Sequence, residues 1–262
     1  MKKGVQGYTV REFFSSRQQC RETYQKIAAI GYDSVQTGTS GLMTAEELQA
    51  MLEECNLVNC SGGADYEQLT AGGSAVSEAV RQARIFKTPY ISIATLPEAD
   101  RYSRDGMKRY AHSLNAIGAQ LKKEGCSLLY HHHTLEFYSF GGGVNGMDIL
   151  TGETDPESVF FTLDTHWLAA AGTDPVYWIR RLNGRVPIIH FKDYGISDGA
   201  GKIEGVHKTF AEVGEGNMIW PPIVEACRDI GVEFVIVEQD SCKGDPFDSL
   251  RISFENMCRL GV

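Results

Sequence analysis

The sequence has no stretch that is long and apolar enough to cross a membrane. A spanning helix needs roughly 18 consecutive apolar residues, and no such run occurs among the 262 residues. The first seven residues contain two lysines but lack the apolar run of a secretory signal peptide. We therefore expect a cytoplasmic protein with no membrane partner.

Paired cysteines are missing as well. The seven cysteines are an odd number, are scattered from Cys20 to Cys258, and include no C-x-x-C pair. This spacing excludes a zinc knuckle and a dithiol redox motif. We expect reduced thiols with a structural role.

Positive charge is in deficit. Lys and Arg number 25 against 34 Asp and Glu, which gives a formal net charge of -9. Such a balance repels a phosphate backbone, and no basic stripe with interleaved aromatic residues is present. The sequence also has no Gly-x-x-x-x-Gly-Lys loop. We expect no nucleic-acid partner, and a phosphorylated substrate is not required.

What the sequence does contain is a regular alternation of apolar, β-branched segments with longer helical patterns. Strands are predicted near residues 4–10, 33–37, 57–61, 90–95, 127–133, 159–166, 186–192 and 233–239. Helices are predicted near 17–30, 44–55, 74–86, 105–124, 174–182, 219–230 and 247–259. Glycine follows several helices, as in Gly31, Gly125 and Gly231, where it favours a left-handed C-cap.

This alternation predicts an α/β protein with a parallel sheet. Eight strand–helix units favour a single (β/α)8 TIM barrel with a parallel eight-stranded core over residues 1–262. An open doubly wound sheet alternates in the same way. Two long segments, residues 134–157 and 194–216, interrupt the rhythm, and we interpret both as loops that border a site at the strand ends.

Polar clusters stand at the ends of four apolar runs. They are Tyr130-His131-His132-His133, Leu163-Asp164-Thr165-His166, Ile189-His190-Phe191-Lys192-Asp193 and Val237-Glu238-Gln239-Asp240. Strands buried on both faces do not end in ionisable groups without a reason. Two carboxylates and an imidazole from Asp164, His190 and Glu238 suit Mn²⁺, Mg²⁺, Co²⁺ or Zn²⁺. The pattern predicts one divalent metal ion.

These motifs, in this order, resemble those of xylose-isomerase-like sugar phosphate isomerase/epimerase proteins. The similarity also includes Gly4-Val5-Gln6-Gly7-Tyr8-Thr9-Val10-Arg11, Ala171-Gly172-Thr173-Asp174-Pro175 and Gly214-Glu215-Gly216-Asn217, and so covers nearly the whole chain. The resemblance implies a TIM barrel whose metal is held by Glu, Asp, His and Glu. Asp164, His190 and Glu238 match the last three positions.

The first metal position departs from that pattern. His131 stands where many relatives carry the glutamate, and Glu136 is a competing candidate if the strand end curls inward. An imidazole in place of a carboxylate removes one negative charge, which favours Mn²⁺, Co²⁺ or Zn²⁺ over Mg²⁺. Alternation along a strand would point His131 and His133 to the same side.

The resemblance implies proton abstraction next to a carbonyl through an enediolate that the metal stabilises. Glu238 is the expected base on one side of the substrate, and His133 is the expected base on the other, because an imidazole is half-titrated near neutral pH. Lys192 shares the inward face with His190 and is expected to bind a substrate oxygen.

Other residues are candidates for substrate binding. His166 follows Asp164 by two residues, Trp167 can line a sugar face, and Glu136 lies near the same strand end. Arg11, at the expected end of the first strand, can contact a substrate hydroxyl or carboxylate, or pair with Asp240.

We therefore predict a divalent-metal-dependent isomerase or epimerase of carbohydrate metabolism acting on a small sugar, keto-sugar or cyclitol. A dehydratase or lyase acting on a keto-sugar or inosose would use the same site. A catalytically decayed barrel that binds sugar is a third possibility. A metal-cluster endonuclease is disfavoured by the acidic balance. The protein is a candidate homo-oligomer.

Overall fold

A computed structural model describes residues 1–197 and 207–262. The chain forms two compact units, which are described separately. Unit 1 comprises Met1–Asn59 and Ile188–Val262, and unit 2 comprises Cys60–Pro187. A single domain spanning residues 1–262 stays a prediction.

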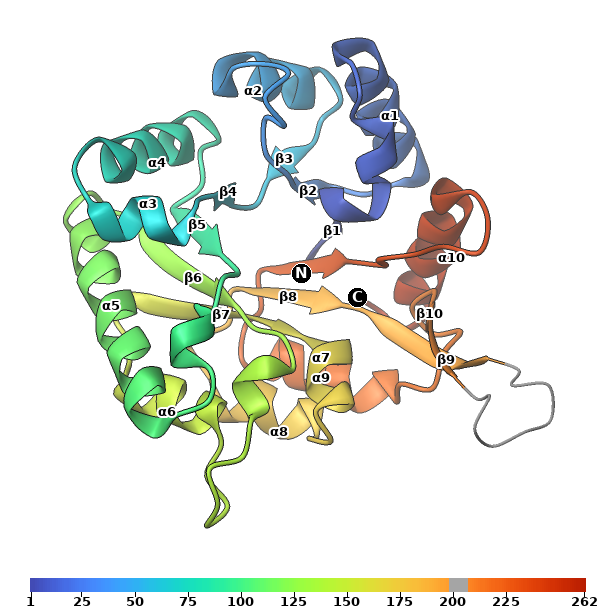
Figure 1. The fold of residues 1–262 in the computed structure, drawn as a ribbon. Helices are drawn as coiled ribbons and strands as arrows, with labels where there is room; N and C mark the ends of the chain where they lie inside the picture. Colours follow the sequence, from blue (N-terminus) through green and yellow to red (C-terminus); the bar gives the residue numbers. More distant parts are fainter. Residues whose placement is uncertain (198–206) are drawn as a thin grey trace. The chain divides into compact units, whose positions relative to one another are not determined.

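Unit 1 is built on parallel strands in the order β3-β2-β1-β11-β8 (Figure 1). The strands are β1 (Lys2–Gln6), β2 (Ser34–Gln36), β3 (Val58–Asn59), β8 (Ile188–Phe191) and β11 (Phe234–Val237). The helices are α1 (Arg17–Ile30), α2 (Ala45–Glu54), α9 (Trp220–Asp229) and α10 (Pro246–Arg259), with the 3-10 helix η1 (Gly7–Phe13) after β1. The predicted helices of this unit are confirmed to within two residues at each end.

Local sequence signals fix the helix ends in unit 1. The Thr44 side chain accepts a hydrogen bond from the Glu47 backbone N–H, and the Glu47 carboxylate accepts one from the Thr44 backbone N–H, which starts α2 with a capping box. Gly31 ends α1 with a left-handed φ of +118°, and a Cβ there would lie 2.6 Å from the Phe254 ring. The predicted glycine C-caps at Gly125 and Gly231 likewise have positive φ.

The segment predicted as a loop over residues 194–216 contains an antiparallel hairpin. Strands β9 (Asp193–Ser197) and β10 (His207–Ala211) pair with Tyr194 opposite Phe210. Residues 198–206 of this predicted loop lie outside the described residues. The turn signals in this glycine-rich segment masked the two short strands.

Unit 2 is built on parallel strands in the order β4-β5-β6-β7. The strands are β4 (Gly62–Gly63), β5 (Tyr90–Ile93), β6 (Ser127–His131) and β7 (Val159–Asp164). The helices are α3 (Tyr66–Ala71), α4 (Ser74–Ile85), α5 (Arg104–Lys123), α6 (Gly146–Glu153), α7 (Thr165–Ala170) and α8 (Pro175–Arg181), with 3-10 turns η2 (Glu98–Asp100) and η3 (Leu135–Phe137). Helix α5 packs on β6, on β7 and on α6.

Several predicted strands end earlier than the sequence pattern suggests, and two of them run directly into a helix. The first ends at Gln6, and the chain turns into η1, so Arg11 lies in a 3-10 helix and not on a strand. The strand predicted near residues 159–166 is β7, which ends at Asp164, and the Asp164 side chain accepts a hydrogen bond from the Trp167 N–H and so starts α7. His166 is therefore a helical residue and not part of the strand as predicted.

The strands that carry the polar clusters are buried as predicted. Every residue of β8 is buried. In each of β6, β7 and β11, all residues but one are buried. In the part of the chain that the structure describes, no helix is long and apolar enough to span a bilayer.

Candidate metal centre and strand-end site

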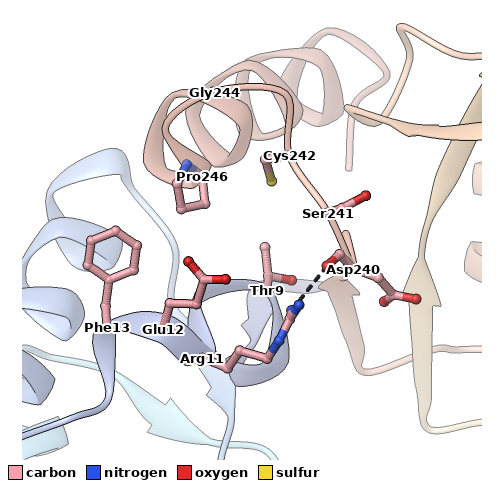
Figure 2. Close-up of a pocket in the computed structure, with 9 residues that line it drawn as sticks. All are labelled: Thr9, Arg11, Glu12, Phe13, Asp240, Ser241, Cys242, Gly244 and Pro246. Carbon is pink, nitrogen blue, oxygen red and sulfur yellow. Dashed lines mark hydrogen bonds between the residues drawn. The ribbon is translucent and has the colours of Figure 1, made fainter.

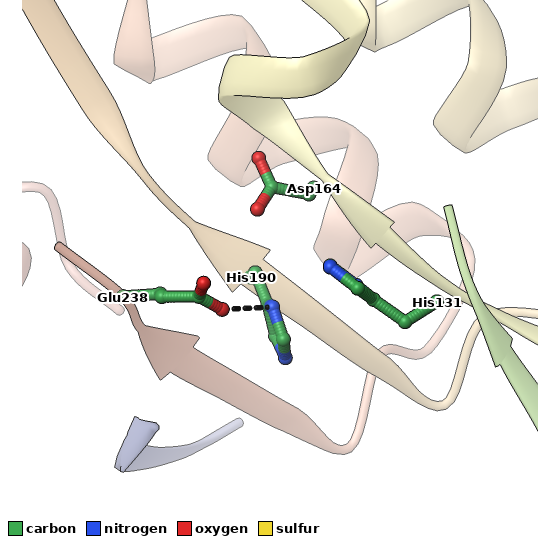
Figure 3. Close-up of side chains that lie close together, drawn as sticks. All are labelled: His131, Asp164, His190 and Glu238. Carbon is green, nitrogen blue, oxygen red and sulfur yellow. Dashed lines mark ion pairs between the residues drawn. The ribbon is translucent and has the colours of Figure 1, made fainter. Parts of the chain in front are cut away.

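In unit 1, an imidazole and a carboxylate meet at the ends of β8 and β11. His190 Nδ1 lies 2.7 Å from Glu238 Oε2 (Figure 3). His190 Nε2 lies 2.6 Å from Gln36 Oε1 at the end of β2. His190 is 2% exposed and Glu238 is 9% exposed. Two ligand atoms of one metal ion lie roughly 3 Å apart, since each bond is about 2.1 Å long. The pair therefore has a spacing that suits a shared ion.

The second Glu238 oxygen meets a buried lysine. Lys192 follows β8, is 1% exposed, and places Nζ 3.0 Å from Glu238 Oε1 and 2.7 Å from Asp240 Oδ1. Burial raises the pKa of the Asp240 carboxyl, and the Lys192 ammonium opposes that rise. The Phe210 ring of β10 lies 5.1 Å from Nζ. A buried ammonium is thus enclosed by two carboxylates and an aromatic ring.

Arg11 serves the backbone after β11. Its Nη1 donates to the Tyr8 carbonyl at 2.8 Å and to the Asp240 carbonyl at 3.0 Å, and its guanidinium stacks on the Tyr8 ring (Figure 2). The contact with Asp240 is therefore to its carbonyl oxygen, and the predicted alternative of an ion pair is not what forms. Arg11 also lines a polar pocket between η1 and the segment after β11.

In unit 2, His131 ends β6 and Asp164 ends the neighbouring strand β7. Both are buried, with His131 at 9% and Asp164 at 0% exposure. Asp164 Oδ1 accepts the Trp167 N–H at 3.0 Å, and the Asp164 N–H donates to His132 Nε2 at 3.1 Å. The helix cap thus orients the Asp164 carboxylate, and the His132 imidazole holds the Asp164 backbone.

The other imidazoles of unit 2 form a row with Trp167. The ring of His133 lies 4.8 Å from that of His131 and 5.5 Å from that of Trp167. The ring of His166 lies 4.6 Å from that of Trp167. The prediction that His131 and His133 share a side agrees with this contact. His133 is half-buried, whereas His132 is fully buried and its Nδ1 contacts the His133 carbonyl at 3.0 Å.

Glu136 has a structural environment inside unit 2. It is 1% exposed, its Oε1 accepts from the Tyr130 hydroxyl, and its Oε2 accepts the His133 backbone N–H at 2.8 Å. Both oxygens are engaged by residues of the same strand end. This environment favours His131 over Glu136 as the candidate ligand.

Three residues make contacts that support the site and that the sequence did not predict. Gln36 contacts His190, Asp240 contacts Lys192, and Asp193 organises the chain after β8. The Asp193 carboxylate accepts the backbone N–H groups of Tyr194, Gly214, Gly216 and Met218 and the indole N–H of Trp220 at 2.6–3.3 Å. All three end or follow apolar strands, and that position was the available signal.

Comparison with known proteins places this geometry in a family. A family model described as a xylose isomerase-like TIM barrel matches residues 24–258. This chain belongs to the xylose isomerase-like TIM barrel family. The predicted fold class and the resemblance of the motifs are thereby confirmed.

The chain is similar to curated relatives that are described as inosose dehydratases. The chain is 32% identical over 161 residues to inosose dehydratase from Lacticaseibacillus casei, covering 56% of this chain and 52% of that protein. It spans about half the length of the curated relatives it matches.

Two solved structures share the fold. A sugar phosphate isomerase/epimerase from Parabacteroides distasonis superposes with a TM-score of 0.79 at 21% identity, over 98% of this chain and 93% of that one. The IOLI protein with a bound zinc atom superposes with a TM-score of 0.73 at 13% identity, over 99% and 98%. At these identities the likeness concerns the fold alone.

Proposed function

We propose that His131, Asp164, His190 and Glu238 hold one divalent metal ion. All four side chains are buried, and each offers one ligand atom. In a TIM barrel the carboxyl ends of the strands converge on one axis. His131 and Asp164 end their strands, Glu238 directly follows β11, and His190 is the next-to-last residue of β8. Two imidazoles and two carboxylates form a mixed N/O set that suits Zn²⁺, Mn²⁺ or Co²⁺. The zinc atom in one structural neighbour supports the same conclusion.

We further propose that the chain is a dehydratase of a keto-sugar or inosose. The observation that carries this proposal is the buried arrangement at Glu238, where one oxygen meets the His190 ring and the other meets the Lys192 ammonium. Such a group binds and orients the oxygens of a polyhydroxylated ketone. The similarity to inosose dehydratases over part of the chain supports removal of water over the isomerase reaction that the sequence first favoured.

The roles of the residues follow from their chemistry. A divalent ion held by these residues would polarise the substrate carbonyl. His133 accepts the proton from the carbon next to the carbonyl at an imidazole nitrogen. Lys192 donates a hydrogen bond to a substrate oxygen on which negative charge develops. The electron pair of the broken C–H bond forms the C=C bond as the C–O bond on the next carbon breaks, and the leaving hydroxyl takes the proton from the His133 imidazolium to form water.

The remaining candidates line the substrate in this proposal. Trp167 and His166 line the substrate beside His133. The Trp167 ring lies 5.5 Å from the His133 ring and 4.6 Å from the His166 ring. Arg11 lines the polar pocket after β11 and can receive a distal hydroxyl, while Glu136 acts by holding the His133 backbone.

An isomerase or epimerase is the second candidate function. It needs a base on each face of the substrate carbon, and the chain offers two in Glu238 and His133. The fold shared with a sugar phosphate isomerase/epimerase is compatible with this outcome.

One experiment separates these functions. The purified protein is reconstituted with Zn²⁺, Mn²⁺ or Co²⁺ and incubated with an inosose or a keto-sugar in deuterated water, and the products are weighed by mass spectrometry. Metal-dependent loss of one water supports the dehydratase, whereas deuterium incorporation without loss of water supports the epimerase. If no metal leads to loss of water or to deuterium incorporation, both proposed functions are contradicted. Tight sugar binding without either change would indicate a catalytically decayed barrel that binds sugar.

A further inference from the structure

Lys192 is a charged group in an environment that cannot solvate it. Its side chain is 1% exposed, and the desolvation of an ammonium must be offset by charged partners at close range. Glu238 provides one partner at 3.0 Å and Asp240 provides the other at 2.7 Å. In the proposed function Glu238 also serves the metal ion. Asp240 is then the carboxylate whose contact with Lys192 is independent of the metal.

The backbone that carries Asp240 is fixed by η1. Thr9 Oγ1 accepts the Gln239 N–H at 3.0 Å, and Arg11 Nη1 donates to the Asp240 carbonyl at 3.0 Å. Figure 2 shows the Arg11 guanidinium at that carbonyl, with the Asp240 carboxylate turned away from it. Arg11 is itself held by the Tyr8 carbonyl and ring. The Asp240 side chain therefore projects toward Lys192 from a backbone with two anchors.

Phe210 closes the third side of the ammonium. Its ring lies 5.1 Å from Nζ, a distance at which a cation is attracted to an aromatic face. A carboxylate at 2.7 Å has a more defined direction than a ring, because a charge-assisted hydrogen bond is short and linear. Of Phe210 and Asp240, Asp240 therefore sets the direction in which the Lys192 ammonium points.

We propose that Asp240 is a positioning residue that holds the Lys192 ammonium against Glu238, with Arg11 fixing the backbone of Asp240. This inference rests on the proposed function for the role of Lys192, while the positioning itself is a property of unit 1. Asp240 need not touch the substrate. Its loss should weaken turnover because the ammonium adopts several orientations, and it should leave the metal ligands in place.

The test compares Asp240→Asn with two further variants. Asp240→Asn keeps the size of the side chain and removes its charge, and Asp240→Glu keeps the carboxylate. Asp248→Asn is the matched control, because Asp248 is 69% exposed on α10 and pairs with Arg251 on the surface. Each protein is measured for metal content, for kcat and KM with an inosose, and for the ¹⁵N signal of the Lys192 ammonium, which is assigned with Lys192→Arg.

Asp240→Asn is expected to keep wild-type metal content and KM, to lower kcat by about 10- to 100-fold, as changes at supporting partners of a site do, and to broaden the Lys192 signal. Asp240→Glu is expected to recover part of both. Asp248→Asn should match the wild type. An unchanged Lys192 signal in Asp240→Asn would overturn the proposal, and so would loss of the metal together with kcat.

The two proposals fail differently. If the wild-type protein transforms no inosose or keto-sugar, the proposed function fails, but the Lys192 signal still decides whether Asp240 positions the ammonium. If Asp240→Asn does not fold, the comparison of Asp240→Glu with the wild type decides by the same signal. A narrow, unshifted signal in Asp240→Glu with reduced kcat would contradict positioning.

Discussion

The strand ends of the two units use different chemistry. In unit 1 the carboxylates of Glu238 and Asp240 and the Lys192 ammonium form a charged chain, in which Lys192 lies 3.0 Å from Glu238 and 2.7 Å from Asp240. The His190 ring lies 2.7 Å from the Glu238 carboxylate. In unit 2 the residues after β6 and β7 are mainly imidazole and indole rings in contact, with Asp164 as an acid that also caps a helix.

We infer that the strand-end residues of the two units have different roles. A chain of opposite charges fixes a carboxylate and an ammonium in direction, which suits binding and electrostatic stabilisation. His133, the half-buried imidazole of unit 2, is the proposed base for proton transfer. Variants of unit 1 should therefore alter metal binding and orientation, and variants of unit 2 outside Asp164 and His131 should alter proton transfer.

The largest effect is expected from removing one ligand in each unit. Glu238→Gln and Asp164→Asn should each lower metal affinity by at least about 100-fold and abolish turnover, because each loses a charged ligand. Isothermal titration with Zn²⁺ or Mn²⁺ checks this. Full activity in either variant would contradict the ligand assignment.

The stability of the same two variants without metal should differ. Asparagine is as good an N-cap as aspartate, so Asp164→Asn keeps the start of α7 and should change the free energy of unfolding by less than about 1 kcal/mol. Glu238→Gln leaves Lys192 with one carboxylate and should cost about 1–3 kcal/mol. Urea unfolding of the two metal-free variants measures the difference. Equal losses would argue against the charged chain in unit 1.

His133→Ala should separate proton transfer from metal binding. The ring of His133 is half-buried and contacts His131 and Trp167, so its removal should leave the metal content unchanged. Proton exchange should fall by about 10²- to 10⁴-fold, the usual contribution of a general base. Deuterium incorporation from solvent measures it. A parallel loss of metal would make His133 a ligand.

Asp193→Asn should affect stability more than chemistry. Its carboxylate accepts five N–H groups, and a Cβ on Gly216 would lie 2.2 Å from Oδ1, so no larger residue fits beside it. An amide retains one acceptor oxygen and points N–H groups at the other donors, which should cost about 2–3 kcal/mol. Thermal unfolding of the variant checks this, and an unchanged midpoint would show that the cluster is not needed.

A surface carboxylate gives the smallest effect. Hydrogen bonds from Arg81 and Gln82 lower the pKa of Glu78 to about 2. A lowered carboxyl pKa contributes stability above the unfolded-state pKa of about 4.3, and this stability is lost as the pH falls from there toward 2. Because Glu78 is about half exposed, solvent screens the pair. Glu78→Gln should cost less than about 0.5 kcal/mol at pH 7 in urea unfolding, and a larger loss would contradict this screening.

Much of the fold was predictable because its signals are local. Apolar runs predicted the parallel strands, and residues such as Thr44 and Gly31 predicted helix ends through bonds within one turn. The strand ends at Gln6 and Asp164 were placed too late, since a 3-10 turn and a side-chain cap end a strand without changing its apolar pattern. The pairing of β9 with β10 was missed because both strands are short and lie in a glycine-rich part of the sequence.

Within the site, only the residues near the ends of predicted strands could be found from the sequence. Asp164, His190 and Glu238 follow apolar runs and were found by position, and Lys192 was found by alternation with His190. The partners Gln36 and Asp240 were not found, because a contact between distant strand ends depends on the register of β2, β11 and β8, which one sequence does not encode locally. The role of Arg11 in substrate binding stays a prediction, and its Nη1 contacts with two backbone carbonyls were not predicted.

The most direct test of the central claim is the metal content of three proteins purified in the same way: the wild type, Asp164→Asn from unit 2 and Glu238→Gln from unit 1. The proposed set of four ligands predicts about one divalent metal per chain in the wild type and less than about a tenth of that in each variant. A variant that keeps the wild-type metal content would contradict a centre built from both pairs of ligands.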